Sequence, residues 1–272
     1  MTMSVVKYHA LGNDYLVVDS RYVGVDSLTP PVIARLCDRH HGFGGDGLLW
    51  GPADSHNTVR IFNSDGSWAE NSGNGTHIFA RYLWDTHQAD RESFTVWAHG
   101  IPVSVTISAM DGSIMVDANL GEPQQHEPLT IMVNQQSWQG TRLSWGNPHF
   151  VITRDHVSRD ILDQWGPLLE KHPTFPQRTN VQFMNIVGPD TIRIEIWERD
   201  SGYTLSSGNS AAAAAAVAWQ LGVQAPTRVM MPGGILWVRH DPNTGVWIRG
   251  PVVRVFTGVC DPECLGVLET GL

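Results

Sequence analysis

Two copies of the tripeptide Ser-Gly-Asn carry the residues best suited to hold a small anion. Ser72-Gly73-Asn74 and Ser207-Gly208-Asn209 each follow a strand-like run and precede a helical pattern. The first backbone N–H groups of a helix lack intrahelical partners and lie at the positive end of the helix dipole, which suits a carboxylate. Because serine is a common N-cap, either copy alone is better explained as a cap. The presence of two copies favours a binding role.

A second set of polar residues, near the ends of strand candidates, fits the recognition of an α-amino acid. Arginine binds a carboxylate through two hydrogen bonds, asparagine donates or accepts, and a glutamate beside an arginine can hold an ammonium group. Any single asparagine is equally well explained as a turn residue, and Pro148 restricts the backbone before it. The set consists of Asn63, Asn147, Asn180, Glu198 and Arg199.

The two halves of the chain resemble each other at a fixed offset. Residues 59–65 resemble residues 194–200, shifted by 135 positions, and the same shift superposes the two Ser-Gly-Asn copies. A shift of 134 places Gly12-Asn13 on Gly146-Asn147. Repeats of this kind predict two similar domains packed face to face. We expect one domain over residues 1–118, completed by 262–272, and a second over 119–261.

The elements that must position these residues are short strands that alternate with a few helices. Apolar periodicity predicts helices over residues 30–40, 74–86, 159–171 and 209–221. Alternating and β-branched runs predict strands over residues 5–19, 59–63, 94–98, 101–107, 113–116, 141–153, 181–187, 191–197, 228–231, 235–238, 246–249 and 252–257. The alanine run 211–216 permits close packing and fits a helix buried at the centre of a barrel.

Composition excludes several classes of protein. Of the 272 residues, 42% are hydrophobic and 17% are charged, which is enough for a sizeable core. The net charge of −9 argues against a nucleic-acid partner, and the apolar run 211–219 is too short to span a membrane. No signal peptide is expected at residues 1–10. An odd number of cysteines, namely Cys37, Cys260 and Cys264, indicates a reducing, cytoplasmic setting.

Other familiar motifs are absent or out of context. Residues 42–47 match G-x-G-x-x-G, but a helix precedes them and a strand follows, the reverse of the order that a dinucleotide site requires. We therefore interpret this segment as a tight turn. The sequence contains no C-x-x-C pair and no H-E-x-x-H, so no metal site is expected. His149 is the only histidine inside a motif of interest, and a half-buried structural histidine is the favoured explanation.

Several blocks, in order along most of the chain, resemble the diaminopimelate epimerase family. They are residues 9–14, 37–47, 60–66, 72–75, 146–149, 178–180, 197–199 and 204–209. The resemblance implies an α/β (α+β) fold of two pseudo-symmetric domains, each a barrel-like, mostly antiparallel sheet around a central helix. It also implies a ligand site in the cleft between the domains, no cofactor such as pyridoxal phosphate, and inversion of an α-carbon by two facing cysteines. Because family members are often dimeric, the resemblance also implies that this chain can form a homodimer.

The resemblance carries roles to particular residues. Asn63, Asn180, Glu198 and Arg199 would hold the distal end of the substrate. The reacting carboxylate would lie against Asn13 and the two helix starts at Gly73-Asn74 and Gly208-Asn209. Both positions of the family's catalytic cysteines are serines here, Ser72 and Ser207. Tyr203 stands where the family usually has glutamate, and Asn71 replaces an apolar residue.

These departures affect the chemistry more than the binding. A serine hydroxyl is a far weaker acid than a thiol and needs a neighbouring base. The nearest sequence candidate is His77 for Ser72, expected to face elsewhere, and Ser207 has none. Two-base racemisation is therefore expected to be slow or absent. Carboxyl or imidazole groups would have to act instead, and the candidates are Asp14, Asp46, Asp65 and His149.

Three functions remain. The preferred one is a cofactor-independent isomerase that acts on an α-amino acid or an amino-acid-derived metabolite, with its chemistry repurposed to isomerisation or cyclisation. The second is a diaminopimelate epimerase or related racemase inactivated by Cys-to-Ser mutation, against which Tyr203 and Asn71 argue. The third is a catalytically silent amino-acid-binding protein. In each case the expected partner is a small amino-acid-like molecule.

Overall fold

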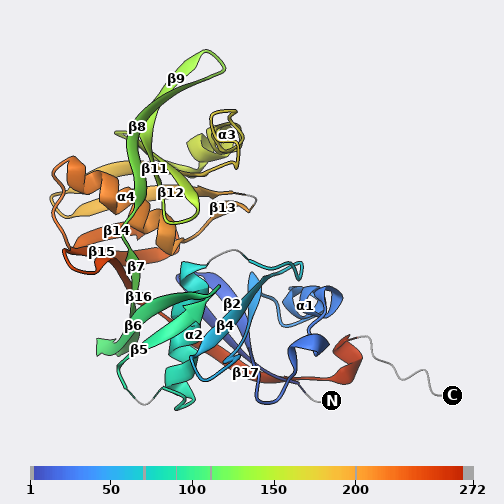
Figure 1. Cartoon of the computed structure of the whole chain (residues 1–272). Helices are drawn as coiled ribbons and strands as arrows, with labels where there is room; N and C mark the ends of the chain where they lie inside the picture. The colour runs from blue at the N-terminus through green and yellow to red at the C-terminus, as the bar shows by residue number, and fades with distance from the viewer. Residues whose placement is uncertain (1–2, 70–71, 90, 111, 200, 266–272) are drawn as a thin grey trace. The chain divides into compact units, whose positions relative to one another are not determined.

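The computed structural model describes residues 3–69, 72–89, 91–110, 112–199 and 201–265 (Figure 1). The chain divides into two compact units. Unit 1 comprises Met1–Ala118 and Pro251–Leu272, and unit 2 comprises Asn119–Gly250. Each unit contains one large, mostly antiparallel sheet and a helix that begins at a Ser-Gly-Asn copy. The predicted fold class is confirmed.

The sheet of unit 1 is built from both ends of the chain. Its strands pair in the order β17, β1, β2, β3, β4, β5, β6, β7. The β2–β3 and β4–β5 pairs are parallel, and the others are antiparallel. The bounds are β1 Met3–Ala10, β2 Asn13–Asp19, β3 Gly47–Gly51, β4 Thr58–Asn63, β5 Ser93–Ala98, β6 Ile101–Met110, β7 Ser113–Gly121 and β17 Val253–Cys260.

Unit 2 repeats this pairing pattern strand for strand. Its order is β8, β9, β10, β11, β12, β14, β15, β16, with β10–β11 and β12–β14 parallel. The short strand β13 is an addition that pairs with β12. The bounds are β8 Gln124–Val133, β9 Gln136–Ser144, β10 Pro148–Thr153, β11 Asn180–Gly188, β12 Thr191–Glu198, β13 Gly202–Thr204, β14 Thr227–Met231, β15 Gly234–Asp241 and β16 Gly245–Pro251. The repeat seen in the sequence is therefore a repeat of topology.

Two of the helices are central to their units. In α4 (Gly208–Gln220) every residue from Gly208 to Ala218 is buried, and in α2 (Gly73–Asp85) nine residues are buried. Small side chains let the α4 backbone approach the surrounding strands closely, as the alanine run predicted. The remaining helices are α1 (Pro30–Cys37), α3 (Arg159–Glu170) and the 3-10 turns η1 (Val25–Ser27) and η2 (Pro262–Leu265). In the described part of the chain, no helix is long and apolar enough to cross a bilayer.

Several boundaries differ from the sequence-based expectation. The predicted strand 5–19 is divided into β1 and β2 by a turn at Leu11 and Gly12, both in the left-handed region, and the predicted strand 141–153 is divided into β9 and β10 by a turn at Gly146. Strand β8 was not predicted. Helix α1 ends at Cys37 rather than at residue 40, because the following loop turns back and its amides bond the last helical carbonyls, among them Gly45 N–H to Cys37 O at 3.0 Å. Residues 251–261, which were expected in the second domain, lie in unit 1. Strand β17 pairs with β1 from Met3–Cys260 to His9–Val253, a contact across the whole chain that no local pattern reveals. Residues 266–272 of the expected completing segment lie outside the described residues.

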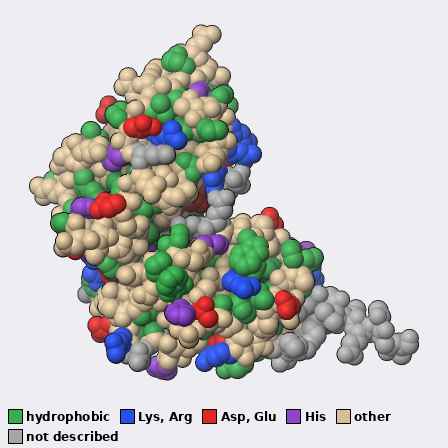
Figure 2. All heavy atoms as spheres, in the orientation of Figure 1, with side chains coloured by type: hydrophobic (Ala, Val, Ile, Leu, Met, Phe, Trp, Pro, Cys, Tyr) green, Lys and Arg blue, Asp and Glu red, His purple; other side chains and the backbone are tan. Residues whose placement is uncertain are grey.

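The two faces of the unit 1 sheet have different partners. One face packs with Ile33 and Leu36 of α1 in a core that also contains Cys37 and Cys260, with partly buried Cys264 packed against it. The other contacts α2, where the rings of Tyr8 and Tyr82 meet edge to face at 6.4 Å. In unit 2, Trp138 and Phe183 stack at 5.5 Å in the core beside α3. On the surface shown in Figure 2, acidic and basic side chains are interspersed.

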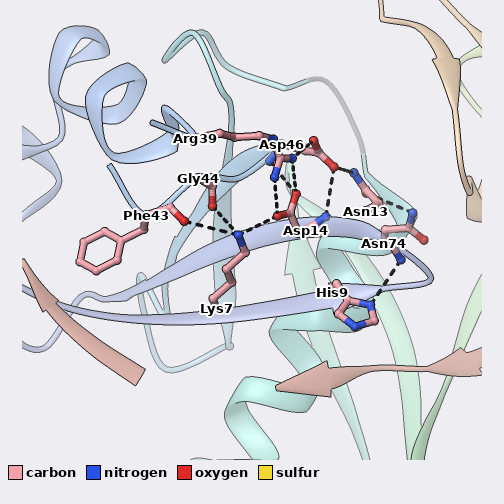
Figure 3. Close-up of polar contacts among 10 residues, drawn as sticks. Lys7, His9, Asn13, Asp14, Arg39, Phe43, Gly44, Asp46 and Asn74 are labelled. Carbon is pink, nitrogen blue, oxygen red and sulfur yellow. Dashed lines mark hydrogen bonds and ion pairs between the residues drawn. The ribbon is translucent and has the colours of Figure 1, made fainter. Parts of the chain in front are cut away.

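A charged cluster fixes the β1–β2 hairpin of unit 1 to the loop after α1 (Figure 3). Asp14 accepts hydrogen bonds from Arg39 at 2.8 and 3.1 Å and pairs with Lys7 at 2.8 Å. Asp46 bonds Arg39, the Asn13 side chain and the Asp14 amide. Burial alone would raise the pKa of the Asp14 carboxyl, but the bonds from Arg39 and Lys7 outweigh it and lower that pKa to about 2. The ionised form of Asp14 therefore stabilises the fold.

We expect Asp14→Asn to lower the free energy of unfolding by about 2 kcal/mol at pH 7, measured by urea denaturation. The folded pKa lies below the unfolded value, so the contribution of Asp14 is complete above about pH 5 and is lost as the pH falls towards 2. The difference between the two proteins should shrink over that range. Asp26→Asn, at an exposed position in η1, should change stability by less than about 0.5 kcal/mol. An equal loss at pH 7 and near pH 2 would contradict the assignment.

Candidate functional site

In unit 1, Ser72 begins α2 and makes two side-chain contacts that define the helix start. Its backbone is extended, and its hydroxyl oxygen accepts a hydrogen bond from the Gly75 amide at 2.9 Å, so it is an N-cap. The phenol oxygen of Tyr15 lies 3.1 Å from the same hydroxyl. The Asn74 amide group donates to the Asn13 side chain at 3.1 Å. In unit 1 the structure therefore places Ser72, Gly73, Asn74 and Asn13 beside one another, and their binding role stays a prediction.

Unit 2 repeats this arrangement at the start of α4. Ser207 is also extended and accepts from the Ser210 amide at 3.4 Å. The Asn209 side chain donates to Asn147 at 3.3 Å, which matches the Asn74–Asn13 bond. Asn13 and Asn147 each follow a glycine in the left-handed region, Gly12 at φ 92° and Gly146 at φ 88°. Each unit thus holds a capped helix start whose asparagine is hydrogen-bonded to the asparagine that follows a tight glycine turn. The N-terminus of a helix in this arrangement is suited to bind a carboxylate.

The residues expected to hold the distal end of a substrate are divided between the units. In unit 2, Asn180 donates to Pro148 O at 2.9 Å and accepts from the Arg199 amide at 2.9 Å, so it ties the end of β12 to the start of β10. Glu198 precedes Arg199 and is half-buried. Asn63 is the exposed last residue of β4 in unit 1, and its side-chain amide donates to Ser67 Oγ in the turn that follows. Substrate roles for these four residues stay predictions.

Three of the four acid–base candidates are occupied in local contacts. Asp14 and Asp46 belong to the ion-paired cluster of Figure 3. Asp65 caps a turn: the Ser67 hydroxyl and amide donate to it at 2.6 and 2.8 Å, and these bonds lower its pKa. These carboxylates are engaged in contacts that hold the fold of unit 1, which leaves them poorly placed to take protons from a substrate.

The fourth candidate, His149, is fully buried and neutral. Gln182 directs its amide nitrogen at His149 Nδ1, 3.2 Å away, and at Ser210 Oγ, 3.0 Å away. An amide nitrogen only donates, so Nδ1 accepts and the imidazole proton is on Nε2. Burial lowers the pKa of His149 to about 3, ahead of smaller effects from Gln182 and Arg199. His149 can donate a hydrogen bond, but as an imidazolium acid it is unsuited to pH 7.

Sequence reasoning missed Tyr15 and Gln182. His77 was the candidate base for Ser72, but its Nδ1 lies 2.8 Å from Gly73 O on its own helix, which confirms that it faces elsewhere. The residue that does lie beside Ser72 is Tyr15, which belongs to β2 and is 57 residues away in the sequence. A polar residue on an inward-facing strand position was the only signal, and many core positions share it.

Other features of interest lie outside the two helix starts. Tyr203 bonds Glu195 at 3.2 Å, and its ring lies under Arg159 of α3. Asn71 lies outside the described residues. A cavity of about 270 Å³ in unit 1 is lined by Tyr82 and Thr86, at the opposite end of α2, which is ~20 Å long. Among the described residues, no group of His, Cys, Asp and Glu could hold a metal ion.

The cysteines do not replace the missing thiols. All three are free and belong to unit 1. Burial, helped by Asp14 and Asp46, raises the pKa of Cys37 to about 12. Burial together with the neighbouring Cys264 raises the pKa of Cys260 to about 11. Both are therefore thiols, rather than the reactive thiolate, at neutral pH.

Comparison with solved structures reproduces the fold over the whole chain. A phenazine biosynthesis protein of the PhzF family from Bacillus anthracis matches with a TM-score of 0.68, covering 96% of this chain and 99% of the other at 14% identity. A hydroxyproline epimerase from Agrobacterium vitis, solved with trans-4-hydroxy-L-proline, matches with a TM-score of 0.67 over 99% and 96% at 14% identity. At such identities the likeness concerns the fold alone.

Comparison with characterised sequences is more specific. The family model for diaminopimelate epimerase matches residues 5–125 and 141–255. Diaminopimelate epimerase 2 from a Nostoc species is 37% identical over 280 residues, which cover 97% of this chain and 98% of the relative. Diaminopimelate epimerase from a Synechocystis species is 37% identical over 282 residues, covering 95% and 99%. With the duplicated helix starts and the two-unit fold, these matches show that the chain belongs to the diaminopimelate epimerase family.

Proposed function

We propose that the protein is a cofactor-independent isomerase that acts on an α-amino acid or an amino-acid-derived metabolite without a pair of thiols. Membership of an epimerase family places it in the isomerase class. The observation that carries the finer proposal is the matched pair of helix starts. Ser72 and Ser207 cap them, and the Asn74–Asn13 and Asn209–Asn147 bonds lock them in the same way.

The binding half of the proposal follows from the helix starts. The backbone at Gly73-Asn74 and at Gly208-Asn209 lies at the positive end of a 13-residue helix in each unit. We propose that both helix starts serve one ligand and hold its reacting carboxylate. Asn63, Asn180, Glu198 and Arg199 would hold the distal end. The duplication supports this interpretation, because two copies of one anion site are otherwise redundant.

The chemical half rests on what hydroxyls can do. A hydroxyl at a helix start is still far less acidic than the thiol of an ordinary cysteine, so direct α-proton removal would be slow. Solved structures with this fold include a methylitaconate-delta-isomerase, with a TM-score of 0.65 at 12% identity. That protein supports the idea that the fold can host isomerisations other than α-carbon inversion. We propose isomerisation or cyclisation of this kind.

Two alternatives use the same site. A diaminopimelate epimerase or related racemase inactivated by Cys-to-Ser replacement is supported by the relatives at 37% identity. A silent binding protein is supported by the poor placement of Asp14, Asp46 and Asp65 for proton transfer. We further propose a cytoplasmic enzyme, in line with three free cysteines. The homodimer stays a prediction.

We expect at least one α-amino acid to stabilise the chain in a thermal-shift screen of diaminopimelate and amino acids derived from lysine, aspartate and tryptophan. Ligand at 100 times its Kd should raise the melting temperature by roughly 5 °C. Asn209→Asp should remove this shift in melting temperature. A carboxylate at position 209 interacts favourably with the helix dipole, so the fold is kept, but it repels a bound anion. Asn243→Asp makes the same charge change in an exposed turn of unit 2 and should keep it. Failure of every amino acid to stabilise the chain would overturn the binding assignment.

Restoring cysteines at positions 72 and 207 distinguishes the repurposed isomerase from the inactivated epimerase. We expect the Ser72→Cys/Ser207→Cys double variant to exchange the α-proton of diaminopimelate in deuterated water no faster than the natural chain, because a repurposed site no longer positions that substrate. Mass spectrometry of the substrate follows the exchange. Rapid exchange by the double variant would instead support an inactivated epimerase. Turnover of any amino acid by the natural chain would exclude the silent binding protein.

A further inference from the structure

The hydroxyl of Ser72 has a phenol beside it, and that phenol is held in place by the fold of unit 1. Tyr15 is 8% exposed, and its hydroxyl oxygen lies 3.1 Å from Ser72 Oγ. Tyr15 belongs to β2, whereas Ser72 caps α2, so the contact joins the sheet to the central helix of unit 1. A capping serine needs only the Gly75 amide, and capping therefore does not explain the phenol.

Gly47 makes room for the Tyr15 ring. Strand β3 lies parallel to β2, with Gly47 directly opposite Tyr15 in the register. A Cβ atom at residue 47 would lie 2.4 Å from the Phe62 carbonyl oxygen and 2.6 Å from Tyr15 Cε1, both closer than such atoms pack. The Tyr15 ring therefore occupies the space that a side chain at position 47 would need, and a glycine there leaves the ring room to reach Ser72.

The surroundings of the Ser72 oxygen favour negative charge on it. It already accepts a hydrogen bond from the Gly75 amide at 2.9 Å, at the positive end of α2. Either oxygen of the Tyr15–Ser72 pair can be the donor, and when the phenol donates, Tyr15 adds a second donor to the Ser72 oxygen. We propose that Tyr15 is a positioning residue that hydrogen-bonds the group at position 72 and makes that group easier to ionise. What that group then acts on rests on the proposed function.

The second unit has no equivalent phenol, so the two serines differ chemically. The offset that places Asn13 on Asn147 places Tyr15 on His149, whose Nδ1 faces Gln182. In the described part of the chain, the Ser207 oxygen has one hydrogen bond, from the Ser210 amide at 3.4 Å. Ser72 is therefore the more readily ionised of the two. This inequality suits a reaction with a fixed direction better than a symmetric racemisation.

A thiol introduced at position 72 reports its own pKa without any substrate. In the Ser72→Cys variant, the rate of iodoacetamide alkylation of the introduced thiol is measured against pH. Peptide mass spectrometry resolves it from Cys37, Cys260 and Cys264, and the profile gives the midpoint of its ionisation. We expect a midpoint below the ordinary value of about 8.5. Adding Tyr15→Phe, which keeps the ring and removes the hydroxyl, should raise the midpoint by about one pH unit.

The matched control is Tyr82→Phe in the same background. It also removes a buried phenol from unit 1, but its hydroxyl bonds Asp19 at the far end of α2, so the midpoint should not move. Circular dichroism checks that each variant is folded. An unchanged midpoint in the folded Tyr15→Phe variant would overturn the proposal. The result needs no ligand, so it stands apart from the thermal-shift screen: either assignment can fail while the other holds.

Discussion

The unpaired N–H groups at the start of a helix are the constraint on which both units depend. In α2 and α4 these groups lie inside a sheet-lined unit, where bulk water cannot satisfy them all. Ser72 and Ser207 each accept one of them. The same two residues occupy the positions where the family resemblance places the reacting groups. The side chain that caps each helix is therefore also the one to which we assign a place at the proposed ligand site.

The elements around each helix start serve to hold it. The asparagine pairs tie the helices to the turns at Gly12 and Gly146, and the Lys7–Asp14–Arg39–Asp46 cluster anchors the first of those turns. Unit 2 uses different chemistry at the matching place, where Gln182 bonds both neutral His149 and the Ser210 hydroxyl in the first turn of α4. The two halves share a duplicated backbone, while the side chains beneath it differ.

The sequence was informative where a feature is local or repeated. The Ser-Gly-Asn copies predicted where α2 and α4 begin to within one residue, and the offset of about half the chain predicted two similar units. Contacts between segments far apart in the chain could not be predicted from the sequence. The Tyr15–Ser72 pair spans 57 residues, and β17 returns to pair with β1 from the other end of the chain. Side-chain packing decides such contacts, and a single sequence does not encode it in any short pattern.

Backbone amide NMR of the ¹⁵N-labelled chain, titrated with the amino acid that stabilises it most, tests the central claim most directly. The account predicts that the amide signals of Gly73 and Gly208 move together along one saturation curve, because in the proposed function both helix starts would hold the same carboxylate. Movement confined to one unit, or centred on the cavity at Tyr82 and Thr86, would contradict it.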